Sequence, residues 1–516
     1  MQNSQSENSD ISESKSSQNH QEKSFENYIN DFKTKLKSLF HEENDINKLS
    51  VTRGMPDHIW KEIMAFNPLS ISIPSEYGGR GNHVYENLTL LSAASYESLA
   101  LSLTFGINSA LFLQPVAKYG QDSAKKGVFD RFMKLQNMGG LMITEPGFGS
   151  DALNMQTSYV ENEHSFHLKG TKHWAGLTGQ ADFWLLTARK QASHGGLMRD
   201  VDFFISDNSQ PEQKIVVEEY FENLGLYQIP YGRNILDVEI PKHQKLVPHN
   251  TGVQMMLDLL HRSRLQFPGM GLGFIQRMLD EAVTHVQQRL VGGKSLFSYD
   301  QVQQRLARLQ ADFTICSAFS LKSIELADIK NDLTSYGFEA NIIKTVTTDL
   351  MQHASQSVLT LVGAAAYKLN HVAGRGTMDC RPFQIFEGSN DILYIQIAES
   401  VLKQMKTAGL NNFYSFLQNH NLASRAADLI KSMVNFEIDL QLPQRKLAEL
   451  GQVMSRIASM DMVIVLGEKG FRSDLIENTI SILRQEIDGL VNTYTYNQKA
   501  VVVADYREGS SWQSFV

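Results

Sequence analysis

The spacing of apolar residues changes twice along this chain, and that change limits the folds open to it more than any other feature. From about residue 25 to 140, apolar residues recur every three or four positions, as in amphipathic helices. From about 141 to 248 the chain has short β-rich runs separated by Gly, Asn and Asp, which predict a small β-barrel or sandwich. From about 249 to 405 long helical patterns return. We therefore expect a mainly α protein with a central β domain.

The two ends of the chain differ from this middle part. Residues 1–24 are rich in Ser, Gln, Asn and Glu, without an apolar run, which predicts a disordered tail and neither a secretory signal nor a transit peptide. Residues 406–516 continue the helical pattern, for example over 423–436, and form a helical extension.

Composition excludes several classes of function. The formal charge of -8 argues against nucleic acid as a partner, because phosphate binding requires a basic face. Two cysteines, Cys316 and Cys380, are too few for a disulfide framework and favour a cytoplasmic location. The longest apolar stretch, 88–116, is interrupted by Glu97, so we expect no membrane span and at most a peripheral membrane contact. No metal site is predicted.

Glu387 is the strongest candidate for a catalytic residue. It lies in a glycine-containing segment, 381–392, whose apolar side chains are Phe383, Ile385, Phe386 and Ile392. Loss of hydration there raises the pKa of a carboxyl and its strength as a base, which abstraction of a weakly acidic C–H proton requires. The alternative is that Glu387 only caps a helix that starts near Asn390.

Two further segments carry polar groups suited to a cofactor. Residues 143–151 combine hydroxyls with glycines that free backbone N–H groups, and such groups can hydrogen-bond a ring edge and a phosphate. Residues 170–176 follow after a short strand. Together with Glu387, these segments resemble the acyl-CoA dehydrogenase family of flavoenzymes. Residues 73–79, and Arg289 with Gly293 and Gln301, extend the resemblance over about residues 60–405 in the family's order.

The resemblance implies an N-terminal helical domain (25–140), a β-barrel domain (141–248), a C-terminal four-helix bundle (249–405) and a homodimer or homotetramer. It also implies FAD as cofactor, because no side chain accepts a hydride. Glu387 would then remove the α-proton of an acyl-CoA, while its backbone N–H and a ribityl hydroxyl would bind the thioester oxygen. Gly388 would allow the acyl chain to approach the backbone closely.

Other site residues are carried over by the same resemblance. Thr144 matches a contact to the flavin pyrimidine, and Ser150 a contact to the bound acyl-CoA. Trp174 matches an aromatic residue over the flavin face; the alternative is a Trp buried in the barrel core. The positions that match the adenosine and pyrophosphate contacts, with the Arg crossing from a neighbouring subunit, are Arg289, Gln301 and Ser389. Those assigned to the substrate besides Ser150 are Arg264, Phe386 and Gly388.

Several positions depart from the family pattern. Gly176 stands where a Thr usually bonds flavin N5, and we expect either Thr178 or a backbone group to serve instead. Gly363–Ala366 replaces a glycine-rich stretch near a neighbouring FAD, Gly292 replaces a Phe, and Met378 replaces an Arg. Cofactor contacts therefore differ while the base is retained, which indicates a divergent subfamily.

The expected reaction is FAD-dependent α,β-dehydrogenation of an acyl-CoA, with electrons passed to an electron-transfer flavoprotein. Ile107 stands near a position where medium-chain relatives close the acyl pocket with a polar residue, which favours a long chain, although core packing explains Ile107 equally well. The extension resembles a domain of some long-chain members. The alternatives are an acyl-CoA oxidase, an acyl-ACP dehydrogenase on the same fold, and a flavin-free acyl-CoA-binding scaffold.

Overall fold

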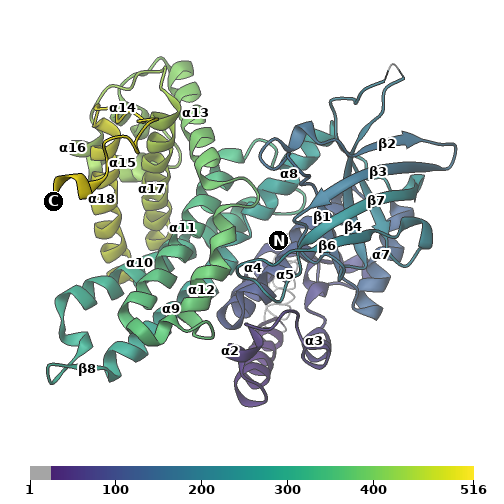
Figure 1. Cartoon of the computed structure of the whole chain (residues 1–516), viewed down its shortest axis with the longest axis horizontal. Coiled ribbons are helices and arrows are strands. Elements are labelled where there is room, and N and C mark those ends of the chain that lie inside the picture. The colour runs from purple at the N-terminus through teal and green to yellow at the C-terminus, as the bar shows by residue number, and fades with distance from the viewer. Residues whose placement is uncertain (1–24, 194) are drawn as a thin grey trace, which may run out of the picture.

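The computed structural model describes residues 25–193 and 195–516, and the predicted tail at 1–24 lies outside these residues. The β domain occupies one end of the molecule and the helical extension the other, with long helices between them (Figure 1). The expectation of a mainly α protein with a central β domain is confirmed.

Helices form the N-terminal part. Residues 25–37 are helical and run into a π-helical turn at Ser38–Glu42. The following helices are α2 (Ile46–Leu49), α3 (Asp57–Met64), α4 (Val84–Glu97), α5 (Leu99–Asn108), α6 (Gln114–Tyr119) and α7 (Asp122–Leu135). The whole of α5 is buried, because it lies between the β domain and the helices of the C-terminal part.

One curled sheet forms the β domain. Its strands are β1 (Gly139–Met142), β2 (Ser158–Glu161), β3 (Ser165–His173), β4 (Phe183–Lys190), β5 (Asp202–Asp207), β6 (Val216–Tyr220) and β7 (Gly232–Pro241). The order is β1-β4-β2-β3-β7-β6, with β5 paired to β4. β3 and β7 run antiparallel from Ser165↔Pro241 to His173↔Arg233. Six consecutive residues of β4 are buried, since both of its faces are covered.

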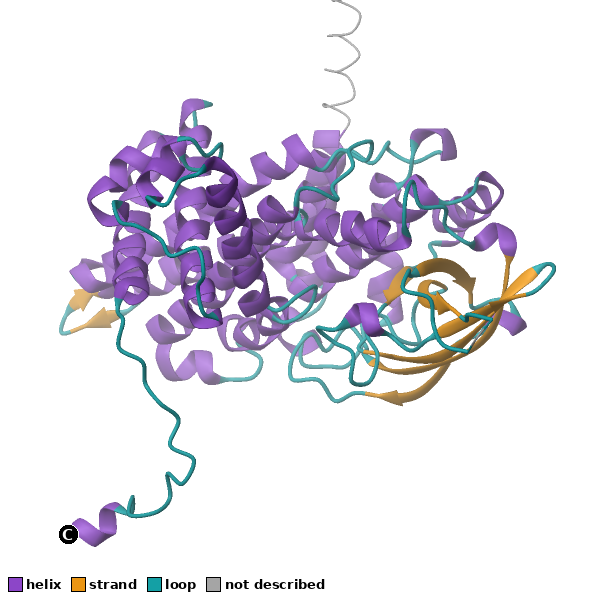
Figure 2. Ribbon diagram, turned by 90° about the horizontal axis from the view of Figure 1, so that it is seen from above, coloured by secondary structure: helices purple, strands orange, loops and turns teal. Residues whose placement is uncertain are grey.

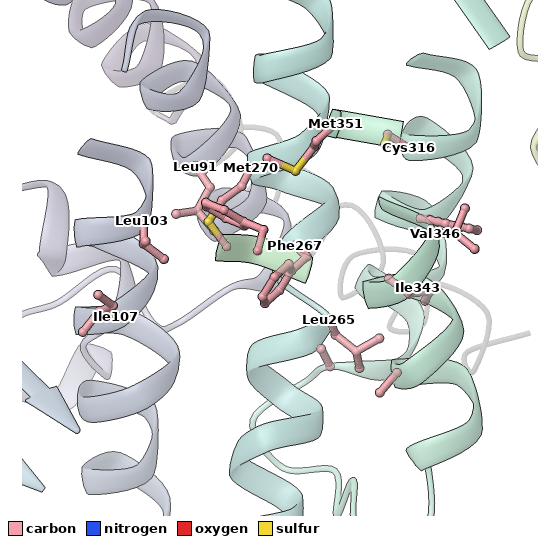
Figure 3. Packing of buried hydrophobic residues seen from close by; sticks show 14 of the residues in the cluster. Leu91, Leu103, Ile107, Leu265, Phe267, Met270, Cys316, Ile343, Val346 and Met351 are labelled. Carbon is pink, nitrogen blue, oxygen red and sulfur yellow. The ribbon is translucent and has the colours of Figure 1, made fainter. Parts of the chain in front are cut away.

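The C-terminal part consists of long helices. They are α8 (Gly252–Arg264), α9 (Phe267–Gln288), α10 (Asp300–Leu326), α11 (Gly337–Val362), α12 (Val372–Cys380) and α13 (Asn390–Ala408). A small hairpin of β8 (Leu290–Val291) and β9 (Lys294–Ser295) joins α9 to α10. Figure 3 shows the apolar packing between α5, α9, α10 and α11, with Leu103 and Ile107 one turn apart on α5.

The extension contains α14 (Phe413–Gln418), α15 (Ser424–Ala427), α16 (Lys431–Val434), α17 (Gln444–Glu468) and α18 (Ser473–Thr495). The helical pattern expected over 423–436 is divided in the structure into two four-residue helices, separated by a 3-10 turn at Asp428–Ile430. α17 packs along α13 and α10. Beyond α18 the chain leaves the body as an extended arm that ends in a short turn at Trp512–Phe515 (Figure 2).

Two stretches contradict the expectation that no segment of the chain is long and apolar enough for a membrane span. Leu99–Tyr119 and Gln444–Glu468 have the length and hydropathy of a membrane span. Inside the fold, however, 94% and 67% of their apolar windows are buried, as in core helices of a globular protein.

The β-domain core generates a prediction about stability. Trp184 on β4 is 1% exposed, whereas Trp512 in the terminal arm is 73% exposed. We expect Trp184→Ala to lower the free energy of unfolding by about 3–5 kcal/mol, because it leaves a large cavity. Trp512→Ala should change it by less than about 0.5 kcal/mol. Urea titration of both variants checks this, and equal losses would contradict the assignment of the core.

Candidate active site

A cavity of about 430 Å³ lies where the β domain meets α5, α8 and the start of α13. One wall comes from the loop after β1 and from the segment after β3. The opposite wall comes from α8 and from the turn that precedes α13. Its apolar part is lined by Leu103, Ile107, Leu111, Leu141, Met256, Leu257 and Leu260.

Glu387 lines this cavity from a strained turn. Its φ is +56°, in the left-handed region that non-glycine residues rarely adopt. Its Oε1 accepts a hydrogen bond of 2.8 Å from Ser263 Oγ. Its Oε2 is buried and has no hydrogen-bond partner within the described residues. The alternative that Glu387 caps α13 is wrong, because Ser389 is the N-cap residue.

Two buried cations hold the backbone of this turn. Arg264 Nε and Nη2 donate to the carbonyl oxygen of Glu387, at 3.0 and 2.7 Å. Lys344 Nζ donates to the carbonyl oxygen of Gly388 at 2.9 Å and to Asn390 Oδ1 at 3.1 Å. The turn is thus fixed through its carbonyls, which leaves Oε2 of the carboxylate without a partner.

The charges around Glu387 act in opposite directions. Burial raises the pKa of the Glu387 carboxyl, while the hydrogen bond from Ser263 and the charges of Arg264 and Lys344 lower it. Burial lowers the pKa of Lys344 to about 7 and that of Arg264 to about 10, against the attraction of Glu387. The desolvated carboxyl therefore has the raised pKa that a general base uses.

The loop after β1 forms the facing wall. Thr144, Gly149 and Ser150 line the cavity. The loop is fixed by Glu145, whose carboxylate accepts hydrogen bonds from the backbone N–H groups of Gln156 and Thr157. Glu145 also pairs with the fully buried Lys172 at 2.8 Å.

Trp174 is exposed to the cavity. It is 55% exposed, has a φ of +56°, and packs against Phe221 with the two rings tilted by 49° and their centroids 4.6 Å apart. The alternative that Trp174 is buried in the barrel core is therefore wrong. The Trp that is buried in this domain is Trp184.

Thr178 does not take the place of the Thr that the family has at the position of Gly176. Its Oγ1 is buried, donates to the Ala175 carbonyl at 2.7 Å and accepts from Asn234, so it faces the sheet and not the cavity. A Cβ on Gly176 would lie 2.8 Å from Ile107 Cδ1, so Ile107 occupies part of the space that a larger residue would need.

The remaining predicted residues divide into two groups. Arg264, Phe386 and Gly388 line the cavity. Gly388 has a φ of +93°, and a Cβ there would meet Leu393 at 2.9 Å. Arg289 and Gln301 are exposed near the β8–β9 hairpin, at the far end of α9 from the cavity (Figure 1). Ser389 lies beside the cavity without lining it. A role of Arg289 and Gln301 across a subunit boundary stays a prediction.

Sequence reasoning missed four polar residues of the site. Ser263 and Lys344 hold the Glu387 turn, and Asn341 accepts a hydrogen bond of 2.7 Å from Arg264. His261 lines the cavity, and burial lowers its pKa to about 4, so its imidazole is neutral near pH 7. The only local signal was the position of Ser263 next to Arg264. Within the described residues no group of three or more His, Cys, Asp or Glu side chains could hold a metal ion.

Comparisons with known proteins place these features in context. The models of the N-terminal, middle and C-terminal domains of acyl-CoA dehydrogenase match residues 31–135, 140–238 and 250–402. An acyl-CoA dehydrogenase from Bacillus subtilis (strain 168) is 24% identical over 68% of this chain and 91% of its own length.

Two further relatives differ in how much they cover. The mitochondrial very long-chain specific acyl-CoA dehydrogenase of Mus musculus is 22% identical over 72% of this chain, which spans only 58% of the mouse protein. A solved structure of an acyl-CoA dehydrogenase complexed with FAD from Bacillus anthracis superposes with a TM-score of 0.72 at 17% identity. The superposed region covers 91% of this chain and 87% of the Bacillus anthracis chain.

The raised pKa of Glu387 predicts a pH-dependent effect of Glu387→Gln on stability. A carboxyl whose pKa is higher in the folded than in the unfolded state stabilises the fold while protonated, and this contribution is lost as pH rises through the folded pKa. The neutral amide avoids that loss. The difference in unfolding free energy, variant minus parent, should therefore be more positive at pH 8 than at pH 5, in urea titrations. A difference that is constant, or that falls with pH, would mean that Arg264 and Lys344 keep the carboxylate charged throughout.

Proposed function

Because this chain belongs to the acyl-CoA dehydrogenase family, we propose that it converts a long-chain acyl-CoA to the trans-2-enoyl-CoA, with Glu387 as the base. The observation that carries the proposal is that Glu387 lines the cavity and that its buried Oε2 has no hydrogen-bond partner within the described residues. A buried acceptor without a partner is costly, and its retention is typical of a functional group.

The residues around the cavity fit an FAD cofactor. Trp174 offers an exposed aromatic face, and Thr144 and Ser150 offer hydroxyls from a loop held rigidly by Glu145. A Cβ on Gly147 or Gly149 would meet no atom within 4 Å, so this loop is open toward a large ligand. When bound, the flavin supplies the hydride acceptor that side chains lack.

The backbone of the same turn supports binding of the thioester oxygen. The N–H of Glu387 has no acceptor within the described residues. The carbonyl oxygens of Glu387 and Gly388 are held by Arg264 and Lys344 respectively. A fixed, unpaired N–H can stabilise the negative charge that develops on this oxygen when the α-proton leaves. One residue would thus provide both the base and an oxyanion donor.

The apolar end of the cavity supports a long acyl chain. Leu103, Ile107 and Leu111 line it from α5 and the π-helical turn that follows, and all three side chains are apolar. The chain is similar to both very long-chain and short-chain specific relatives, so the proposal of a long chain depends on the lining of the cavity.

Further parts of the proposal rest on the family alone or on composition. We propose an electron-transfer flavoprotein as electron acceptor and a homodimer or homotetramer as the assembly. A cytoplasmic location suits two cysteines that are both free and buried.

The central test is Glu387→Gln. The amide is nearly isosteric but cannot accept the proton, so the rate of flavin bleaching by a long-chain acyl-CoA should fall by roughly 10²–10⁴-fold. Anaerobic stopped-flow absorbance measures this rate, with equal flavin content as the control for folding.

Other outcomes of that experiment would overturn the assignment. Unchanged bleaching in Glu387→Gln would exclude Glu387 as the base. A parent that binds flavin without bleaching would point to an acyl carrier protein substrate. A parent that binds none would favour the scaffold, and fast reoxidation by oxygen would favour an oxidase.

Chain length has its own test at Ile107. Ile107→Phe adds apolar volume inside the cavity, so kcat/KM for palmitoyl-CoA should fall at least about tenfold more than that for butyryl-CoA. Ile107→Leu, which conserves volume, should leave the ratio of the two within about twofold. Equal losses with both substrates would show that the acyl chain does not pass Ile107.

A further inference from the structure

The turn that carries Glu387 is held at both of its ends by one carboxylate. Asp349 on α11 accepts hydrogen bonds at Oδ1 from Gln384 Nε2, at 2.7 Å, and from Asn390 Nδ2, at 2.8 Å. Gln384 precedes Glu387 by three residues and Asn390 follows it by three. Asn390 in turn accepts the hydrogen bond of Lys344, which binds the Gly388 carbonyl. Asp349 therefore fixes the frame within which Glu387 keeps its left-handed conformation.

The second oxygen of Asp349 faces the helical extension. Tyr394 OH donates to Oδ2 at 2.6 Å, and Arg456 Nη2 lies 3.5 Å from the same atom. Arg456 belongs to α17, and its side chain is only 12% exposed. Burial alone would lower the pKa of Arg456, but Tyr394 and Asp349 raise it above its usual value, so its guanidinium stays charged.

The two helices meet closely at this point. A Cβ on Gly451 would lie 2.0 Å from the carbonyl oxygen of Tyr394, so α17 can approach α13 only with a glycine there. Arg456 lies five residues further along α17 and is also paired with Glu486 of α18, at 3.2 Å. Its position is therefore fixed from within the extension.

We infer that Arg456 is a positioning residue for the base: through Asp349 it holds the segment 384–390 and thereby the carboxylate of Glu387. The inference rests on the function proposed above and deepens it, because it gives the extension a part in the reaction. Without Arg456, the half-buried Asp349 would lose the cation beside its Oδ2, and both ends of the turn would lose a rigid anchor.

The test compares Arg456→Met with Arg425→Met. Arg425 serves as the control: it also forms an ion pair within the extension, with the buried Asp461 at 3.4 Å, but its side chain is 44% exposed and its ion pair does not involve Asp349. At equal flavin content, Arg456→Met should lower kcat about tenfold with KM changed less than about twofold, because misplacement of a base affects the chemical step. Arg456→Lys should recover part of kcat, and Arg425→Met should keep that of the parent.

Hydrogen–deuterium exchange gives a readout that does not depend on activity. Peptides that cover residues 381–392 should exchange at least about threefold faster in Arg456→Met than in the parent and in Arg425→Met. If these peptides exchange faster in Arg456→Met but the parent protein does not act on acyl-CoA, the proposed function is overturned. The contact of Arg456 with the Glu387 turn through Asp349 would then still be supported. Unchanged exchange and kcat in Arg456→Met, or equal losses in both Met variants, would overturn the inference.

Discussion

The structure of the site depends on two cations that bind carbonyl oxygens and not the carboxylate beside them. Arg264 and Lys344 hold the carbonyls of Glu387 and Gly388, and this keeps Glu387 in a left-handed conformation. Had either cation formed a direct ion pair with the carboxylate, the pKa of Glu387 would be low and the group a poor base. Because they bind the backbone, they supply nearby positive charge and leave Oε2 without a partner.

This arrangement balances two requirements that conflict. A strong base must be desolvated, yet a buried negative charge must be compensated if the protein is to fold. Burial raises the pKa of Glu387 and lowers those of Lys344 and Arg264, so each group tolerates its position only because the others are present. The single hydrogen bond from Ser263 orients the carboxylate through Oε1 and leaves its other oxygen without a partner within the described residues.

The sequence predicted what depends on local pattern and failed where distant segments meet. The order of helical and β regions follows from periodicity, and the segments around Glu387 and Thr144 were recognisable because their residues are adjacent in the chain. Ser263 and Lys344 could not be found in this way, since the fold alone brings them to Glu387. Thr178 was expected in the cavity from its position near Gly176, but it lies in a turn beyond β3, where the regular alternation of a strand does not hold, and its hydroxyl contacts Asn234.

A strained turn also requires support from outside the cavity, and this accounts for where the extension lies. A left-handed Glu persists only if the surrounding structure leaves it no alternative, and the contacts of Asp349 provide this at both ends of the turn. Asp349 is itself half-buried, and one of its donors, Arg456, comes from α17. Removal of the extension would therefore do more than expose apolar surface: it would uncover a carboxylate on which the geometry of the base depends. A residue of the helical extension, Arg456, which follows Glu387 by 69 positions (456 − 387), thus belongs to the support of the site.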